Sequence, residues 1–172
     1  MTKLLKVFLF VLFILLSAYV FPKSPEFPNP PSDFVQSGEP ADIETSLRRG
    51  YYTNLSRTEV IAHYEKEFNR EFNFYTPRLN YPPEDAPLVI RDQTKSTFLE
   101  EIVHPLRESI YINGFEPKTE EYAQFYKGIR YKQKIIVRYI PSNLWIRLFA
   151  VTGSIISAYF LLKEYQHAKK TN

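Results

Sequence analysis

An apolar run near the C-terminus constrains this chain more than any other feature. Residues Leu144–Leu162 (LWIRLFAVTGSIISAYFLL) contain a single charged side chain, Arg147, and are followed by Lys163. These 19 residues match the roughly 20 that an α-helix needs to cross a hydrocarbon core, at about 1.5 Å per residue. Trp145 and Tyr159 lie near its two ends, as interfacial aromatic residues do. The run therefore predicts a membrane-spanning helix, with a buried core helix as the alternative.

Two details of this run bear on its contacts. Arg147 lies close to the Trp145 end, so its long side chain can reach the headgroups of a bilayer. Small residues recur at a spacing of four, a pattern that allows a second helix to approach closely. The candidate helix–helix contact residues are Gly153, Ser154, Ser157 and Ala158.

The N-terminal segment, residues 1–21, predicts a second membrane helix. An apolar stretch, Leu4–Phe21, is preceded by Lys3 and contains Lys6 near its start, as in a signal sequence. A cleavage site needs small residues separated by one position, whereas Ser17 and Ala18 are adjacent. We therefore expect a retained signal anchor rather than a removed signal peptide.

The distribution of charge predicts the orientation of these two helices. The chain has a net charge of +3, but residues 22–143 carry 16 Lys and Arg against 18 Asp and Glu, which leaves +5 for the two ends. Basic residues next to short membrane flanks mark the cytoplasmic side. We therefore expect both termini, including a basic tail at 163–172, in the cytoplasm, the helices in the plasma membrane and the middle of the chain outside.

The middle of the chain predicts one small extracytoplasmic α+β domain over residues 41–143. It is preceded by residues 22–40, where closely spaced prolines indicate an extended spacer or, alternatively, a peptide ligand for an aromatic groove. About 100 residues are enough for one hydrophobic core. The chain contains no cysteine, which excludes disulfides and a cysteine nucleophile.

A capping signal places the first helix of this domain. Ser56 and Glu59 have the spacing of a capping box, so a helix is predicted to begin at Arg57. Strands are predicted on both sides of the helix, at Gly50–Thr53 and Phe72–Thr76.

Further elements follow from apolar spacing. The pattern predicts a second helix that Pro105 kinks or ends, because apolar residues recur at helical intervals at Phe98, Ile102, Val103, Leu106 and Ile110. A short strand, Ile110–Ile112, and a hairpin turn at Asn113-Gly114 are expected next. The alternating segment Gly128–Pro141 predicts one long, half-buried strand.

This last strand concentrates positive charge on one face. A basic face near a membrane can contact anionic lipid, an acidic polymer or an acidic partner. A solvated strand face, or an edge that lysines protect from aggregation, is the alternative and the more ordinary interpretation. The candidate contact residues are Arg130, Lys132, Lys134 and Arg138.

Chemical motifs are absent from the sequence. The three histidines are scattered, and no nucleophile motif or Gly-rich phosphate loop occurs, so we expect no cofactor and no metal. The leading hypothesis is a non-catalytic membrane protein that binds or assembles with another envelope protein or with itself. An envelope enzyme and a binder of anionic lipid or polymer are the alternatives; nucleic acid is not expected as a partner.

Overall fold

The computed structural model describes residues 3–23, 26–68, 78–79, 98–117 and 119–171. Within these residues the fold is α+β, with three α-helices and antiparallel strands, in agreement with the predicted class. The chain forms two compact units, Met1–Ser24 with Pro141–Asn172, and Pro25–Ile140. The first holds α1 (Lys3–Val20) and α4 (Leu144–Thr171), and the second holds the described strands and α2 (Arg57–Phe68).

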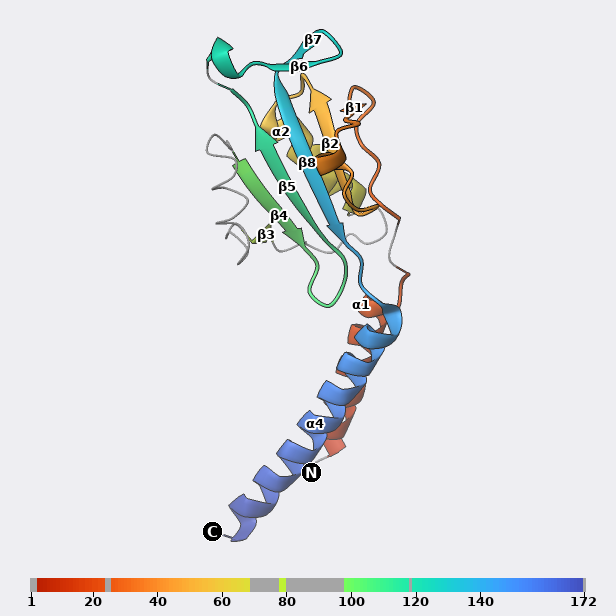
Figure 1. The fold of residues 1–172 in the computed structure, drawn as a ribbon. Helices are drawn as coiled ribbons and strands as arrows, with labels where there is room; N and C mark the ends of the chain where they lie inside the picture. The colour runs from red at the N-terminus through yellow and green to blue at the C-terminus, as the bar shows by residue number, and fades with distance from the viewer. Residues whose placement is uncertain (1–2, 24–25, 69–77, 80–97, 118, 172) are drawn as a thin grey trace. The chain divides into compact units, whose positions relative to one another are not determined.

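The described strands of the domain form a six-stranded sheet in the order β1-β2-β8-β5-β4-β3, and β6 and β7 form a separate hairpin (Figure 1). All neighbours in the sheet are antiparallel. The strands are β1 (Val35–Gln36), β2 (Arg48–Thr53), β3 (Arg78–Leu79), β4 (Phe98–Val103), β5 (Ser109–Phe115), β6 (Gln124–Tyr126), β7 (Ile129–Tyr131) and β8 (Gln133–Ile140). Two 3₁₀ turns, η1 (Pro40–Asp42) and η2 (Glu120–Tyr122), precede β2 and β6.

The core lies between α2 and one face of the sheet. Val60, Ile61 and Tyr64 of α2 are buried against alternate residues of the central strands. Alternate residues share a face because the side-chain period of a strand is two. The strand residues of this core are Tyr51, Phe98, Ile102, Ile110, Ile112, Ile135, Val137 and Tyr139.

The predicted start of α2 is confirmed at Arg57. The backbone N–H of Ser56 donates to Glu59 Oε2 at 2.7 Å, and the N–H of Glu59 donates to Ser56 Oγ at 3.4 Å. These reciprocal bonds satisfy N–H groups that the first helical turn leaves without intrahelical partners. The predicted strand before the helix is also confirmed as part of β2, whereas Phe72–Thr76 lies outside the described residues.

The predicted second helix is wrong, because its residues form the strands β4 and β5. Phe98, Glu100 and Ile102 share the face that packs against α2, and Glu100 is completely buried in an ion pair with Arg57. A carboxylate in the middle of the buried face hides the two-residue period of a strand. The remaining apolar residues then have a spacing that resembles a helix.

The predicted turn at Asn113-Gly114 is also wrong, since β5 continues through both residues to Phe115. A Cβ atom on Gly114 would lie 2.0 Å from the ring of Phe98 on the neighbouring strand. The glycine therefore makes room for an aromatic ring rather than for a turn.

The two ends of β8 divide the domain. The hairpin end, where β8 begins at Gln133, carries β6 and β7, and the exit end, where β8 finishes at Ile140, carries the turn between β4 and β5 (Figure 1). Phe27 packs edge-on against Tyr139, with ring centroids 6.0 Å apart. The chain therefore enters and leaves the domain at the exit end. Phe27 and Phe34, both from the proline-rich stretch, are packed against the core.

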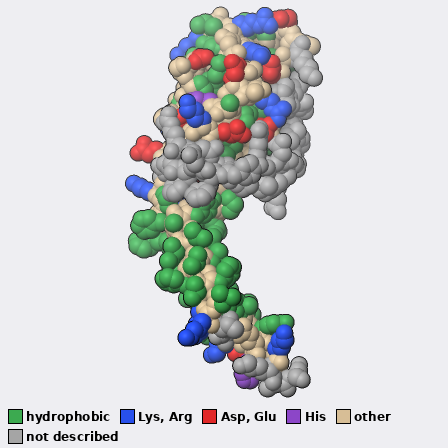
Figure 2. Space-filling model, turned by 180° about the vertical axis from the view of Figure 1, so that it is seen from behind, with side chains coloured by type: hydrophobic (Ala, Val, Ile, Leu, Met, Phe, Trp, Pro, Cys, Tyr) green, Lys and Arg blue, Asp and Glu red, His purple; other side chains and the backbone are tan. Residues whose placement is uncertain are grey.

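The helices α1 and α4 form an antiparallel pair. They contact each other, and Arg147 Nη2 in the first turn of α4 donates to the carbonyl oxygen of Pro22, just after α1, at 3.1 Å. Asn143 caps α4 through its Oδ1 atom, which accepts the N–H of Trp145 at 2.9 Å. Hydrophobic side chains cover most of the visible face of this unit (Figure 2). Both helices are long and apolar enough to cross a membrane, which indicates membrane association.

Candidate binding surface

A tight hairpin, β6–β7, is the most distinctive surface feature of the domain. Its two-residue loop, Lys127-Gly128, has φ values of 52° and 78°. Two successive positive φ values define a type I′ turn, whose twist matches that of paired strands. Gly128 adopts this backbone readily, whereas Lys127 adopts it at some cost.

Aromatic stacking attaches the hairpin to the sheet. The ring of Tyr126 lies on that of Tyr52 in β2, with centroids 4.7 Å apart and planes 12° apart. Tyr126 Oη accepts the backbone N–H of Gly38 at 3.1 Å. At the base of the hairpin, the N–H of Lys132 donates to Asn54 Oδ1 at 2.9 Å. These contacts hold the hairpin in one position, so its exposed side chains are preorganised.

The hairpin presents large apolar side chains to solvent. Phe125 is 60% exposed and Ile129 is 58% exposed. The register pairs Phe125 with Arg130 and Ile129 with Tyr126, so the two exposed side chains lie on opposite faces of the hairpin. A partner that contacts both must therefore enclose the hairpin, as a groove does. Aromatic anchors of this kind dominate the energy of many protein–protein interfaces.

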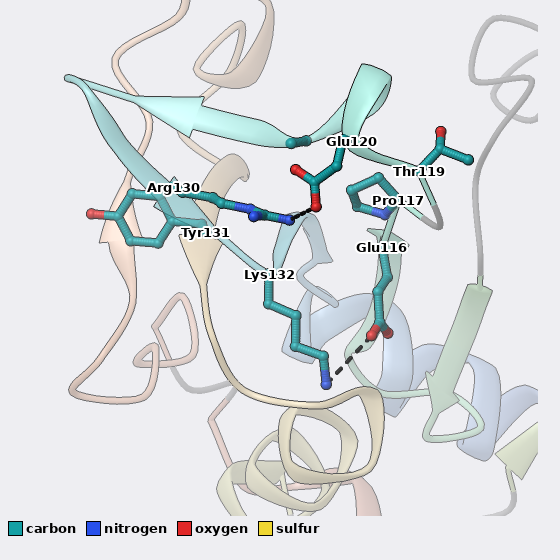
Figure 3. A pocket seen from close by; sticks show the side chains of 8 residues that line it. Glu116, Pro117, Thr119, Glu120, Arg130, Tyr131 and Lys132 are labelled. Carbon is teal, nitrogen blue, oxygen red and sulfur yellow. Dashed lines mark hydrogen bonds and ion pairs between the residues drawn. The ribbon is translucent and has the colours of Figure 1, made fainter.

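A small pocket of about 150 Å³ lies at the base of this hairpin (Figure 3). Arg130 Nη2 is 2.6 Å from Glu120 Oε1, and Lys132 Nζ is 3.3 Å from Glu116 Oε1. Both pairs are partly or largely exposed, so each contributes little to stability and can be exchanged for contacts with a ligand. The lining residues are Glu116, Pro117, Thr119, Glu120, Ala123, Arg130, Tyr131 and Lys132.

The predicted basic strand is divided between different sites. β7 and β8 are separate strands that are interrupted at Lys132, because β7 pairs with β6 and β8 joins the main sheet. Arg130 and Lys132 therefore line the pocket, whereas Lys134 lies on the sheet. Arg138 is exposed near the exit end. The role of the four residues as contacts for an anionic partner stays a prediction.

Lys134 belongs to a partly buried ionic cluster. Its Nζ atom is 2.7 Å from Glu39 Oε2 and 2.8 Å from Asp42 Oδ2, and Tyr52 Oη donates to Glu39 Oε1 at 2.7 Å. Hydrogen bonds from Lys134 and then Tyr52 lower the pKa of the Glu39 carboxyl. Burial by itself would lower the pKa of Lys134, but the bonds to Asp42 and Glu39 outweigh burial and raise it. This cluster attaches η1 to the central strand.

The predicted helix–helix residues fall on different sides of α4. Ser154 and Ser157 are exposed, and a Cβ atom on Gly153 would meet nothing within 4 Å. Ala158 is half-buried, in line with Val151 and other apolar residues spaced three or four apart. In this unit the glycine and the serines are thus not used for close packing, and their contact with another helix stays a prediction.

Sequence reasoning missed the hairpin and the ionic cluster. The signal for the hairpin is short: Lys127-Gly128 between alternating residues, where Gly is at the second loop position that a type I′ turn favours. The cluster joins Glu39 to Lys134 across 95 positions. Only the fold can bring such distant residues together.

The fold and surface define a class: an α+β domain inserted between two paired helices that are apolar enough to cross a membrane. No protein-family profile, no curated protein and no solved structure matches this chain. Among the described residues, no group of three or more His, Asp or Glu side chains could hold a metal ion.

Proposed function

We propose that this protein is a membrane-anchored module that binds another protein through its β6–β7 hairpin. The observation that carries this proposal is the rigid type I′ hairpin with Phe125 and Ile129 exposed at its surface. Burial of an aromatic and a branched aliphatic side chain drives association, at about 25 cal/mol for each Å² removed from water. Lys127, at the tip, favours a partner whose apolar groove has an acidic rim.

The membrane anchor gives this binding module a defined orientation. In the proposed arrangement, α1 and α4 cross the plasma membrane, both termini are cytoplasmic and the domain lies outside. The excess of basic residues at the two ends supports this orientation. Entry and exit of the chain at one end of the sheet also support it, because the opposite end is then free to carry the hairpin to a partner.

Binding of an anionic polymer or lipid through the predicted basic strand has less support. Arg130, Lys132 and Lys134 each lie within 3.3 Å of a carboxylate oxygen, so the local field is close to neutral. The polar pocket at the base of the hairpin is small compared with the 300–1,000 Å³ or so that is usual for ligand sites.

Site-specific crosslinking in intact cells tests the proposal. A membrane-impermeant, thiol-reactive photocrosslinker attached to a Phe125→Cys variant should give a defined adduct, since the chain has no other cysteine. Attachment through Glu44→Cys, an exposed position away from the hairpin, is the matched control. Adduct formation at Phe125→Cys alone is the expected result.

A second substitution, Ile129→Ser, distinguishes a specific partner from a protein that was crosslinked by chance. It should weaken binding of the purified, identified partner by about tenfold or more, as loss of an interface anchor does. Glu44→Ser should leave the affinity unchanged. Absence of an adduct, or an affinity that Ile129→Ser does not change, would contradict the proposal.

A further inference from the structure

The exit end of the domain has its own exposed apolar residues. Leu106, at the tip of the β4–β5 turn, is 52% exposed, and Leu47 and Ile140 are each 37% exposed. Register places them together at this end: Ser109 pairs with Ile140, and the carbonyl oxygen of Leu47 accepts the N–H of Tyr139 at 2.8 Å.

Leu106 also has a costly backbone conformation. Its φ is 59°, in the left-handed region that Gly and Asn adopt most easily. The neighbouring residues His104, Arg107 and Glu108 are buried, so the polar side chains of this turn point inward and its leucine is exposed. A strained, exposed apolar residue is a reason to look for a function, because selection for stability alone would replace it.

Two arginines accompany these apolar residues. Arg48 and Arg138 are directly opposite each other on neighbouring strands, on the face away from α2. Arg48 Nη1 lies 3.2 Å from Glu44 Oε2, and such a partly exposed pair can be exchanged for contacts with a phosphate at little cost. Apolar side chains next to arginines are typical of surfaces that lie in the headgroup region.

The connection to α4 limits how far this end can be from the membrane. Only Pro141, Ser142 and Asn143 separate Ile140 from Leu144, the first residue of α4. Four residue steps span at most about 14 Å even when fully extended. Trp145 is 76% exposed and suits the membrane–water interface. Ile140 is therefore held close to the headgroups, whatever the tilt of the domain.

We infer that the exit end, through Leu106, Leu47 and Ile140 with Arg48 and Arg138, lies on the bilayer surface as an interfacial contact. This inference rests on the membrane anchor of the proposed function and is independent of the hairpin's partner. It makes the bilayer a third support for the domain, beside its two connections. The hairpin end is then directed away from the membrane surface.

Fluorescence quenching in nanodiscs tests the inference. The full-length chain is labelled with an environment-sensitive fluorophore at one position at a time, Leu106→Cys, Phe125→Cys or Ile156→Cys, in bilayers with and without spin-labelled lipids. The expected result is a roughly twofold loss of fluorescence at Leu106→Cys with lipids labelled at the headgroup, and almost none at Phe125→Cys. Because both positions are exposed, the labels should leave the fold intact.

The third position separates the two proposals. Ile156 lies in the middle of the apolar part of α4, and its label should be quenched by lipids spin-labelled deep in the acyl chain. Quenching at Ile156→Cys without quenching at Leu106→Cys would overturn the inference and leave the anchor standing. No quenching at Ile156→Cys would overturn the anchor and the inference together. A Leu106→Cys label that is shielded equally in detergent, without lipid quenching, would show a protein cover and overturn the inference.

Discussion

The two ends of the sheet expose apolar residues in different ways. At the hairpin end, Phe125 and Ile129 lie in strands that a type I′ turn joins, and the Tyr52–Tyr126 stack attaches these strands to the sheet; Tyr52 also donates to Glu39 of the Lys134 cluster. At the exit end, Leu106 stands on a strained turn over buried His104 and an Arg107–Glu108 ion pair. A rigid hairpin suits recognition of one protein partner, whereas a short turn with an exposed leucine suits contact with a lipid bilayer. The comparison shows that the role of an exposed hydrophobic residue depends on the contacts that fix its backbone and its neighbours.

Loss of the Lys134 cluster should have the largest effect on the free energy of unfolding. Lys134→Met leaves Asp42, whose side chain is 3% exposed, without its cation, and should lower the free energy of unfolding by about 2–4 kcal/mol. Lys132→Met, the matched control, removes an exposed pair and should cost less than about 1 kcal/mol. Denaturant unfolding of the full chain in detergent measures both. Equal losses would show that the hairpin end does not depend on its buried cluster.

Acid should loosen the exit end before the hairpin end. Burial lowers the pKa of His104 below 6.5; Glu108 opposes this shift and Arg107 adds to it. The unfolded state then binds the proton more readily, so stability falls as pH decreases below about 6.5. The lowered pKa of Glu39 stabilises the fold above about pH 4.5, and that contribution is lost as pH falls through the lowered pKa.

Hydrogen exchange, corrected for intrinsic rates, locates these two effects. Protection around residues 104–109 should decrease on going from about pH 7 to about pH 5, while residues 38–42 should keep their protection until the pH is below about 4.5. His104→Asn should abolish the first step only. A simultaneous loss at both ends, or a first step that persists in His104→Asn, would show that the two ends respond to acid as one unit.

Substitutions that relieve a positive φ should have the smallest effect on the free energy of unfolding, and the effect should be similar at the two ends of the sheet. Leu106→Asn and Lys127→Asn place a residue that tolerates the left-handed conformation at φ values of 59° and 52°. Each should raise the free energy of unfolding by about 0.5–1 kcal/mol. Only Leu106→Asn should also reduce lipid quenching of a label at Ile140→Cys. A decrease in stability for either variant would show that its side chain, rather than its backbone, decides the balance.

Local chemistry determines which parts of this fold the sequence predicts. The start of α2 follows from bonds between Ser56 and Glu59, three positions apart, and the two helices that are apolar enough to cross a membrane follow from composition alone. β4 was missed because Glu100 is neutralised by Arg57, 43 positions away. The basic strand was predicted as one element because its residues alternate, yet its division at Lys132 depends on which strand each half pairs with. Tertiary pairing, which no local pattern contains, decided both cases.

The position of β8 in the sheet has a consequence for synthesis of the protein. β8 follows all the other described strands in sequence, yet it lies between β2 and β5 and joins them. Until β8 leaves the ribosome, these two strands lack their shared neighbour and expose edges that can pair with other chains. Only residues 141–143 separate β8 from α4, the second helix that is apolar enough to cross a membrane. The domain therefore closes only after β8 has been made, as α4 follows it from the ribosome.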